Sequence, residues 1–167
     1  MRLKYLKQIP YQIAEHLAAN SKIVNLIYND NPSVLTDGDV VKSMQELIQE
    51  NYIGFYPATE TGISTINRNT FIVINCEDFN LKAQDNNVTV TGSIYVTTDK
   101  AHALLDQGRL RLLELIDEID SCLDNEKFIA AGKIQLTTVH YVVFSDFRSG
   151  YRIHFRINDQ PIRKAEL

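Results

Sequence analysis

Residues 88–97 alternate between apolar and polar side chains, which is typical of a β-strand with one buried face. At Thr98 and Asp99 the period changes to that of a helix, and either side chain can cap a helix start. Apolar residues then recur at helical spacing, namely Leu105, Leu112, Ile116, Ile119 and Leu123. This pattern predicts a strand that runs directly into a long helix over 100–123. We expect the helix to pack on the apolar face formed by Val88, Val90, Ile94 and Val96, with Ile116 in the middle of the contact.

The N-terminal part of the chain shows two more amphipathic helical patterns. The first begins near Pro10 and continues to about Tyr28, with a break near Asn20 that Ser21 could cap. The second begins at Thr36 and runs to about Glu50. The turn residues between them predict two separate helices.

The remaining apolar segments have the lengths of strands. They are a short segment at 52–56, a continuous apolar run at 71–74, and two longer segments at 134–144 and 151–157. The run at 71–74 predicts a strand covered on both faces, paired with 88–97 as a hairpin. The order of elements predicts an α+β domain whose mainly antiparallel sheet has about four strands, with the long helix on one face and N-terminal helices.

Composition limits the class of protein. The 167 residues carry a net charge of −4, and this length suits one domain, 1–167, with a short polar tail at about 159–167. An acidic chain neutralises few phosphates, so it is not expected to grip nucleic acid. We expect neither a membrane span nor a signal peptide. The two cysteines, Cys76 and Cys122, fit no metal spacing and predict buried thiols in a reducing compartment.

No residue pattern converges on catalysis. His140 and His154 could face each other across the last hairpin, but two imidazoles without a third ligand make a poor zinc site. Ser145 and Asp146 could supply the serine and the acid of a catalytic triad with the nearby His140. They lie, however, in a stretch with ordinary turn composition. Four acidic residues on the long helix are expected to form a solvated face, namely Glu114, Asp117, Glu118 and Asp120. We therefore expect no catalytic residue, no cofactor and no metal ligand, and a protein that is not an enzyme.

The last strand carries a candidate contact surface. Arg152 and Arg156 flank His154 on its polar face and form a small basic stripe. Such a stripe could meet phosphates or the carboxylates of a partner. An exposed polar strand face explains the same pattern, so both interpretations stay open.

The stretch 57–69 carries the second candidate contact. It is polar and lacks a sustained period, yet it contains Ile63 and Ile66, followed by Arg68. Loops of this length in compact domains are usually functional or mobile. We expect it to be loose in the free subunit and to bury both isoleucines against a partner in an assembly.

The layout and several strings resemble the tail-terminator or tail-completion proteins of long-tailed bacteriophages. The similarity runs from about Ile23 to Ile157 in element order and hydrophobic pattern. The stretches that carry it are Ile-Val-Asn-Leu-Ile-Tyr-Asn-Asp-Asn-Pro at 23–32, Asn-Thr-Phe-Ile-Val-Ile at 69–74, the strand and helix at 88–123, Gly-Lys-Ile-Gln-Leu at 132–136 and Tyr-Arg-Ile-His-Phe at 151–155. The extra short helix within 36–51 departs from the simplest form of that family, so a neighbouring neck component stays open as well.

The resemblance implies a structural role in the virion. Proteins of this type form a homo-oligomeric ring, commonly a hexamer, on the head-proximal end of the tail. The ring stops tail-tube polymerisation and joins the tail to the head, so its partners are the tube or sheath and the head-closure or connector proteins. DNA passes through the lumen without specific binding, and assembly takes place in the host cytoplasm. The alternatives are another neck or head-closure protein and, less favoured, a small-ligand-binding α+β domain.

Overall fold

The computed structural model describes residues 7–55, 60–81, 88–124, 127–128 and 132–158. The helices are α2 (Ile9–Ala19), α3 (Ser21–Tyr28), α4 (Met44–Gln49), α5 (Glu60–Ser64) and α6 (Arg111–Leu123). The strands are β1 (Ile53–Gly54), β2 (Thr70–Leu81), β3 (Val88–Asp99), β4 (Lys127–Phe128), β5 (Gly132–Val143) and β6 (Arg148–Asn158). The predicted α+β class is confirmed, and the predicted polar tail at about 159–167 lies outside the described residues.

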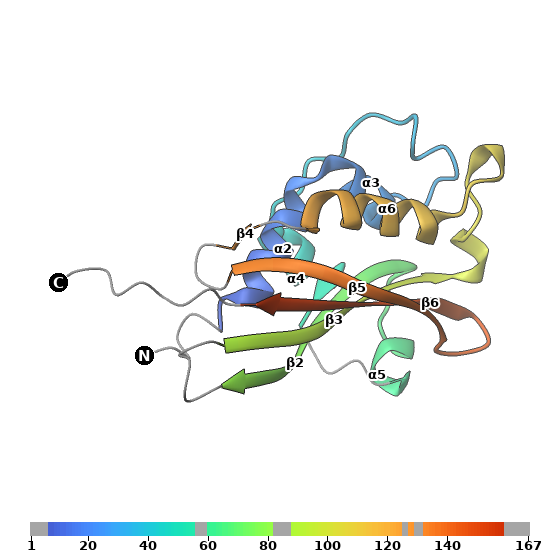
Figure 1. The fold of residues 1–167 in the computed structure, drawn as a ribbon. Helices are drawn as coiled ribbons and strands as arrows, with labels where there is room; N and C mark the ends of the chain where they lie inside the picture. The colour runs from blue at the N-terminus through green and yellow to red at the C-terminus, as the bar shows by residue number, and fades with distance from the viewer. Residues whose placement is uncertain (1–6, 56–59, 82–87, 125–126, 129–131, 159–167) are drawn as a thin grey trace.

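In this part of the chain the strands form one six-stranded sheet in the order β1-β2-β3-β6-β5-β4. Its four long strands pair antiparallel, as predicted. The prediction of about four strands is incomplete, because a two-residue strand lies at each edge: β1 falls within the short segment predicted at 52–56, and β4 was not predicted. One of them, β1, pairs parallel with β2 at Ile72 and Val73, so the sheet is mixed. Helices α2, α3, α4 and α6 lie over one face of the sheet, and α5 lies on the opposite side (Figure 1).

Helix α6 begins at Arg111, so the predicted helix 100–123 is wrong in its first half. Two short 3-10 turns, Lys100–His102 and Asp106–Gly108, precede it. The backbone at Gln107 and Gly108 has positive φ values of 62° and 73°, a conformation that no α-helix contains. The Leu105 N–H then donates to the Arg109 carbonyl at 2.8 Å and closes the turn. A left-handed pair of residues therefore separates strand β3 from the helix.

The N-terminal helices follow their predicted order with two corrections. The break between α2 and α3 is capped by Asn20, whose side chain accepts from the Lys22 and Ile23 N–H groups, and not by Ser21. The second predicted helix begins only at Met44, where Ser43 and Glu46 form a reciprocal capping box. The preceding segment is held instead by side chains, because Asn25 accepts from the Val40 N–H at 2.7 Å. The first correction comes from an asparagine cap, and the second from a side-chain bond that holds the segment before Met44 outside a helix.

The main core lies between the sheet and helices α2, α3 and α6. Its inner-face residues on β3 are those expected, and Val90, Ile94 and Val96 are all buried. The side chain of Val88 is outside the described set. On α6 the contact is centred on Leu115 and Ile119, which are fully buried, whereas Ile116 is only partly buried at its margin. The expected packing of helix on strand is present, but the helix is rotated from the expected orientation.

This rotation has a measurable consequence for stability. Replacing Ile119 with alanine is expected to lower the free energy of unfolding by about 2–5 kcal/mol, because it leaves a cavity in the core. The matched variant Ile116→Ala is expected to lose less, since part of that side chain is already in solvent. Chemical denaturation of both variants provides the test. Equal losses at the two positions would contradict the orientation of α6.

Part of the opposite sheet face is also covered. Ile63, on α5, is fully buried against the outward side chains of Phe71, Val73, Tyr95 and Phe144. All four residues of the run at 71–74 are buried. The prediction that this strand is covered on both faces is therefore confirmed, and α5 is the cover.

Candidate functional site

An apolar surface lies exposed where α6 meets strand β5. Its members, which we call the edge surface, are Leu104, Leu110, Leu113, Val139, Tyr141 and Val143, each between 45% and 61% exposed. They are contiguous: Leu104 pairs with Leu110, Leu113 and Val139 line one groove, and the remaining two follow on the same face of the strand. Contiguous apolar side chains on the surface of a small domain mark an interaction site.

A groove runs along this surface between the helix and the strand. It has a volume of about 420 Å³. Its floor and walls are mainly apolar, with an acidic and hydroxyl rim, and the lining is Leu113, Ile116, Asp117, Asp120, Leu136, Thr137, Thr138, Val139 and Ile153. Figure 1 shows α6 lying above β5 near the border of the sheet. The helix covers the inner side of β5 incompletely, which leaves the groove open.

Strand β5 also has an open backbone edge over most of its length. Among the described residues, β4 pairs with it only at Gly132 and Lys133. The N–H of Leu136 is capped on this side by the Asp124 carboxylate, at 3.2 Å. An edge strand presents unpaired backbone groups that another strand can complete. The edge surface therefore combines apolar side chains with hydrogen-bonding capacity.

The other long edge of the sheet, on β2, is open at its C-terminal end. In the described residues, β1 pairs with β2 only at Ile72 and Val73. The open end carries Glu77, Asp78 and Phe79, and Phe79 is 43% exposed. A shallow depression of about 550 Å³ adjoins it and includes the Arg156 side chain. This end is acidic, with one exposed aromatic ring.

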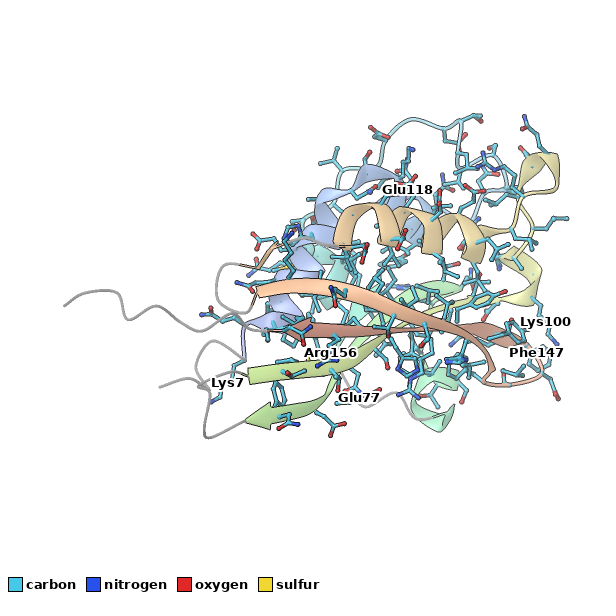
Figure 2. All side chains as sticks on the ribbon, viewed as in Figure 1. Lys7, Glu77, Lys100, Glu118, Phe147 and Arg156 are labelled. Carbon is cyan, nitrogen blue, oxygen red and sulfur yellow. The ribbon has the colours of Figure 1, made fainter. Side chains whose placement is uncertain are left out.

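A polar network occupies the sheet face opposite α6. Ser93 lies at its centre and donates to the Glu77 carboxylate at 2.7 Å, while the Arg152 guanidinium donates to Ser93 at 2.8 Å and to Glu77. His154 Nδ1 lies 3.4 Å from the Ser93 hydroxyl. Glu77 and Arg156 lie on this face, away from Glu118 of α6 (Figure 2). The predicted basic stripe is present, but Glu77 neutralises Arg152 within the subunit.

His154 is held toward its neutral form. Burial is the first cause of its lowered pKa, followed by the positive charge of Arg152, and the nearby His140 ring acts in the same direction. The two imidazole rings stack edge to face with centroids 5.4 Å apart, as the sequence predicted. Within the described residues, no group of three or more histidine, cysteine or acidic side chains is placed to hold a metal ion.

Ser145 and two of the four acidic residues on α6 have local partners. Ser145 caps the β5–β6 turn, where its hydroxyl accepts from the N–H groups of Phe147 and Arg148. On α6, Glu114 pairs with Arg109 and Glu118 pairs with Lys22, so these carboxylates form surface ion pairs. These groups therefore provide turn and surface contacts.

The stretch 57–69 differs from the expected loose loop. Over its described part, residues 60–69, it contains α5, and Ile63 is fully buried within its own subunit while Ile66 is partly buried beside it. Arg68 donates to the Glu50 carbonyl at 2.6 Å and stacks on the Tyr52 ring. The expectation that both isoleucines wait for a partner is therefore wrong for this part. Whether the segment touches another subunit stays a prediction.

Two arginines, Arg148 and Arg111, are buried and hold the structure together, which the sequence pattern did not predict. Arg148 donates to the carbonyls of Ile63, Ile66 and Arg68 at 2.7–2.9 Å and to the Asp99 carboxylate at 2.7 Å, which ties α5 to the sheet. Arg111 is fully buried and donates to four backbone carbonyls, those of Leu26, Asn29, Asn31 and His102. These side chains stabilise the frame that displays the edge surface.

The fold and this surface define a small α+β domain with exposed pairing edges. The family model named YomW matches residues 20–157, and the chain belongs to the YomW family. The family name derives from a phage, which is consistent with this chain being a phage protein. No curated protein matches the chain. No helix in the described part of the chain is long and apolar enough to cross a membrane.

Proposed function

We propose that this protein is a structural component of a phage tail, assembled as a ring at the head-proximal end of the tail tube. The observation that carries the proposal is the edge surface, because exposed apolar side chains beside an unpaired strand favour association with a further chain. The phage-derived family name supports a role in a phage particle. The resemblance to tail-terminator proteins supplies the particular role.

The charge of the chain suits a ring around passing DNA. A protein with a net charge of −4 neutralises few phosphates, so DNA can move through the lumen without being held. A head-to-tail contact closes into a ring when its rotation permits. The partners on the two faces of the ring are the tail tube or sheath below and the head-closure proteins above, and the protein has no catalytic turnover.

The second candidate is another neck protein, such as the head-closure ring. The same edge surface supports it, since both proteins must assemble with copies of themselves. A small-ligand-binding domain is less well supported, because His140 and His154 lie in the middle of the β5–β6 hairpin whereas Asp146 lies in its turn. The three groups are therefore at different levels of the sheet.

A nonsense mutation in the phage gene separates these roles. Loss of a tail terminator is expected to give headless tails whose tubes exceed the normal length, because nothing stops polymerisation. Loss of a head-closure protein is expected to give tails of normal length beside unattached heads. Electron microscopy of lysates distinguishes the two outcomes by the length of the tails and by whether heads are attached. Complete, infectious particles from the mutant would contradict both neck roles.

A further inference from the structure

We propose that the open end of β2 in one copy pairs with the open edge of β5 in the next, and that Phe79 of the first copy enters the groove between α6 and β5 of the second. The inference rests on the proposed ring and names the contact that builds it. The occupant of the groove is thus a second copy of this chain, bound head to tail. The sheet would continue from subunit to subunit around the ring.

The directions of the strands suit such a contact. The four long strands β2, β3, β6 and β5 alternate in direction across the sheet. Because their number is even, β5 of one copy and β2 of a copy placed beside it in the same orientation run in opposite directions. The two edges can therefore form a regular antiparallel ladder without turning either subunit over.

The open parts of the two edges also lie at overlapping heights. Following the pairing across the sheet, Ile74 on β2 is level with Val139 on β5, through Ile94 and Ile153. In the same way Phe79 is level with Ile134. The two-residue strands block opposite ends, since β1 covers β2 near Ile72 and β4 covers β5 near Lys133. Between those blocks, about six residues of each described edge can meet once the Asp124 carboxylate releases the Leu136 N–H.

The apolar side chains match across this contact. Phe79 pairs with Val90, which is buried on the inner face, so the exposed ring projects on the same side of the sheet as α6. In a continued sheet, this is the side on which the groove of the next copy lies. The groove has room for an aromatic ring, and the end that Phe79 reaches from the level of Ile134 is the end that Leu136 lines. Burial of the ring removes two exposed apolar surfaces at once.

The charges match as well. The open end of β2, Asn75–Leu81, carries Glu77 and Asp78 and no basic residue. Strand β5, Gly132–Val143, carries Lys133 and His140 and no acidic residue. Glu77 already pairs with Arg152 in its own subunit, so the carboxylate that the head-to-tail contact brings near Lys133 is that of Asp78, which is level with Gln135. A twofold contact of β5 with β5 would instead bring basic groups together.

Thiol cross-linking tests the contact. One variant carries Asn80→Cys, next to Phe79, and another carries Gln135→Cys on β5; both side chains are exposed. The two proteins are assembled together and treated with a short bismaleimide. The wild type, which carries Cys76 and Cys122, serves as the control for the native thiols. Burial raises the pKa of the Cys76 thiol to about 11 and makes it a poor nucleophile.

The head-to-tail contact is expected to give cross-linked dimers only in the mixture, and a ladder of multimers from the double variant. Dimers from Gln135→Cys alone would overturn it in favour of a twofold β5 contact. Rings without any cross-link would overturn it while leaving the proposed function standing. A wild type that stays monomeric and does not form rings would remove the proposed function itself.

A surface substitution gives an independent reading. Phe79→Asp places a carboxylate in the apolar groove and is expected to abolish assembly while the subunit keeps its fold by circular dichroism. The control is Val41→Asp. Val41 is 90% exposed and is distant in sequence from both edge strands, β2 and β5. It is expected to assemble like the wild type. Normal rings from Phe79→Asp would overturn the contact.

Discussion

Replacing Arg111 with methionine is expected to lower the free energy of unfolding by about 3–5 kcal/mol, in the range seen when one partner of a buried charged contact is removed. The side chain is fully buried, and its guanidinium donates at 2.6–3.1 Å to the carbonyls of Leu26, Asn29, Asn31 and His102. Methionine fills the space but leaves these acceptors without donors. The cation also lies at the C-terminus of α3, where the helix dipole favours positive charge.

Burial lowers the pKa of Arg111, and the negative charge of Asp30 opposes that shift. The group stays charged, because arginine is not deprotonated in proteins. Lysine cannot reproduce the planar fork, so Arg111→Lys is also expected to be destabilised.

Arg109→Ala is the matched control for this position. Arg109 lies two residues away and forms a surface pair with Glu114, in which the arginine side chain is 52% exposed. Its removal is expected to cost no more than about 1 kcal/mol. Urea denaturation of the variants measures the difference. Equal stability of Arg111→Met and Arg109→Ala would contradict the structural role of the buried arginine.

Replacing Gly92 with alanine is the second substitution with a large expected effect, at the upper end of about 1–3 kcal/mol or beyond it. Gly92 lies in the middle of β3, between the two neighbouring strands. An added Cβ would lie 2.3 Å from the Asn75 carbonyl oxygen and 2.5 Å from the Phe155 ring. Either the strand or the ring must move, and both belong to the core of the sheet.

Gly38→Ala provides the comparison for this substitution. An added Cβ at Gly38 meets nothing within 4 Å. The melting temperature of Gly38→Ala is expected to match that of the wild type, while that of Gly92→Ala falls by several degrees. A Gly92→Ala protein as stable as the wild type would show that the sheet relaxes freely around this position.

The long strands could be predicted from the sequence because their alternation reports burial directly. Residues 88–97 and 151–157 pair in the structure with one face inward, as their patterns indicate. The run at 71–74 predicted a cover on both faces. The sequence did not show that residues 60–69 supply that cover. Their isoleucines find partners that are distant in sequence, and Arg148 holds the segment by bonds to its carbonyls.

The start of α6 and the role of Arg111 were harder to predict. Leu105 fits a helical period, but the left-handed backbone at Gln107 and Gly108 ends that period before the helix begins. Arg111 stands four residues before Leu115 and eight before Ile119, so its spacing does place it on the buried face. A charged side chain is, however, usually exposed. The carbonyls that satisfy it are up to 85 residues away in the chain, and no local pattern reveals them.

The edge surface was not predicted, because the candidate contact residues chosen from the sequence lie elsewhere. Arg152 and His154 join a network within the subunit, and Arg156 lies beside the open end of β2. The exposed apolar side chains of β5 have the same alternation as a buried strand. Only the position of α6 shows that the helix leaves them uncovered.

Native mass spectrometry of the purified wild-type protein, with negative-stain imaging of the same sample, tests the central claim most directly. A head-to-tail contact that closes should give one defined oligomer, seen as rings with an open centre, and the resemblance to tail terminators implies six copies. Monomers at every accessible protein concentration, without rings, would contradict the account.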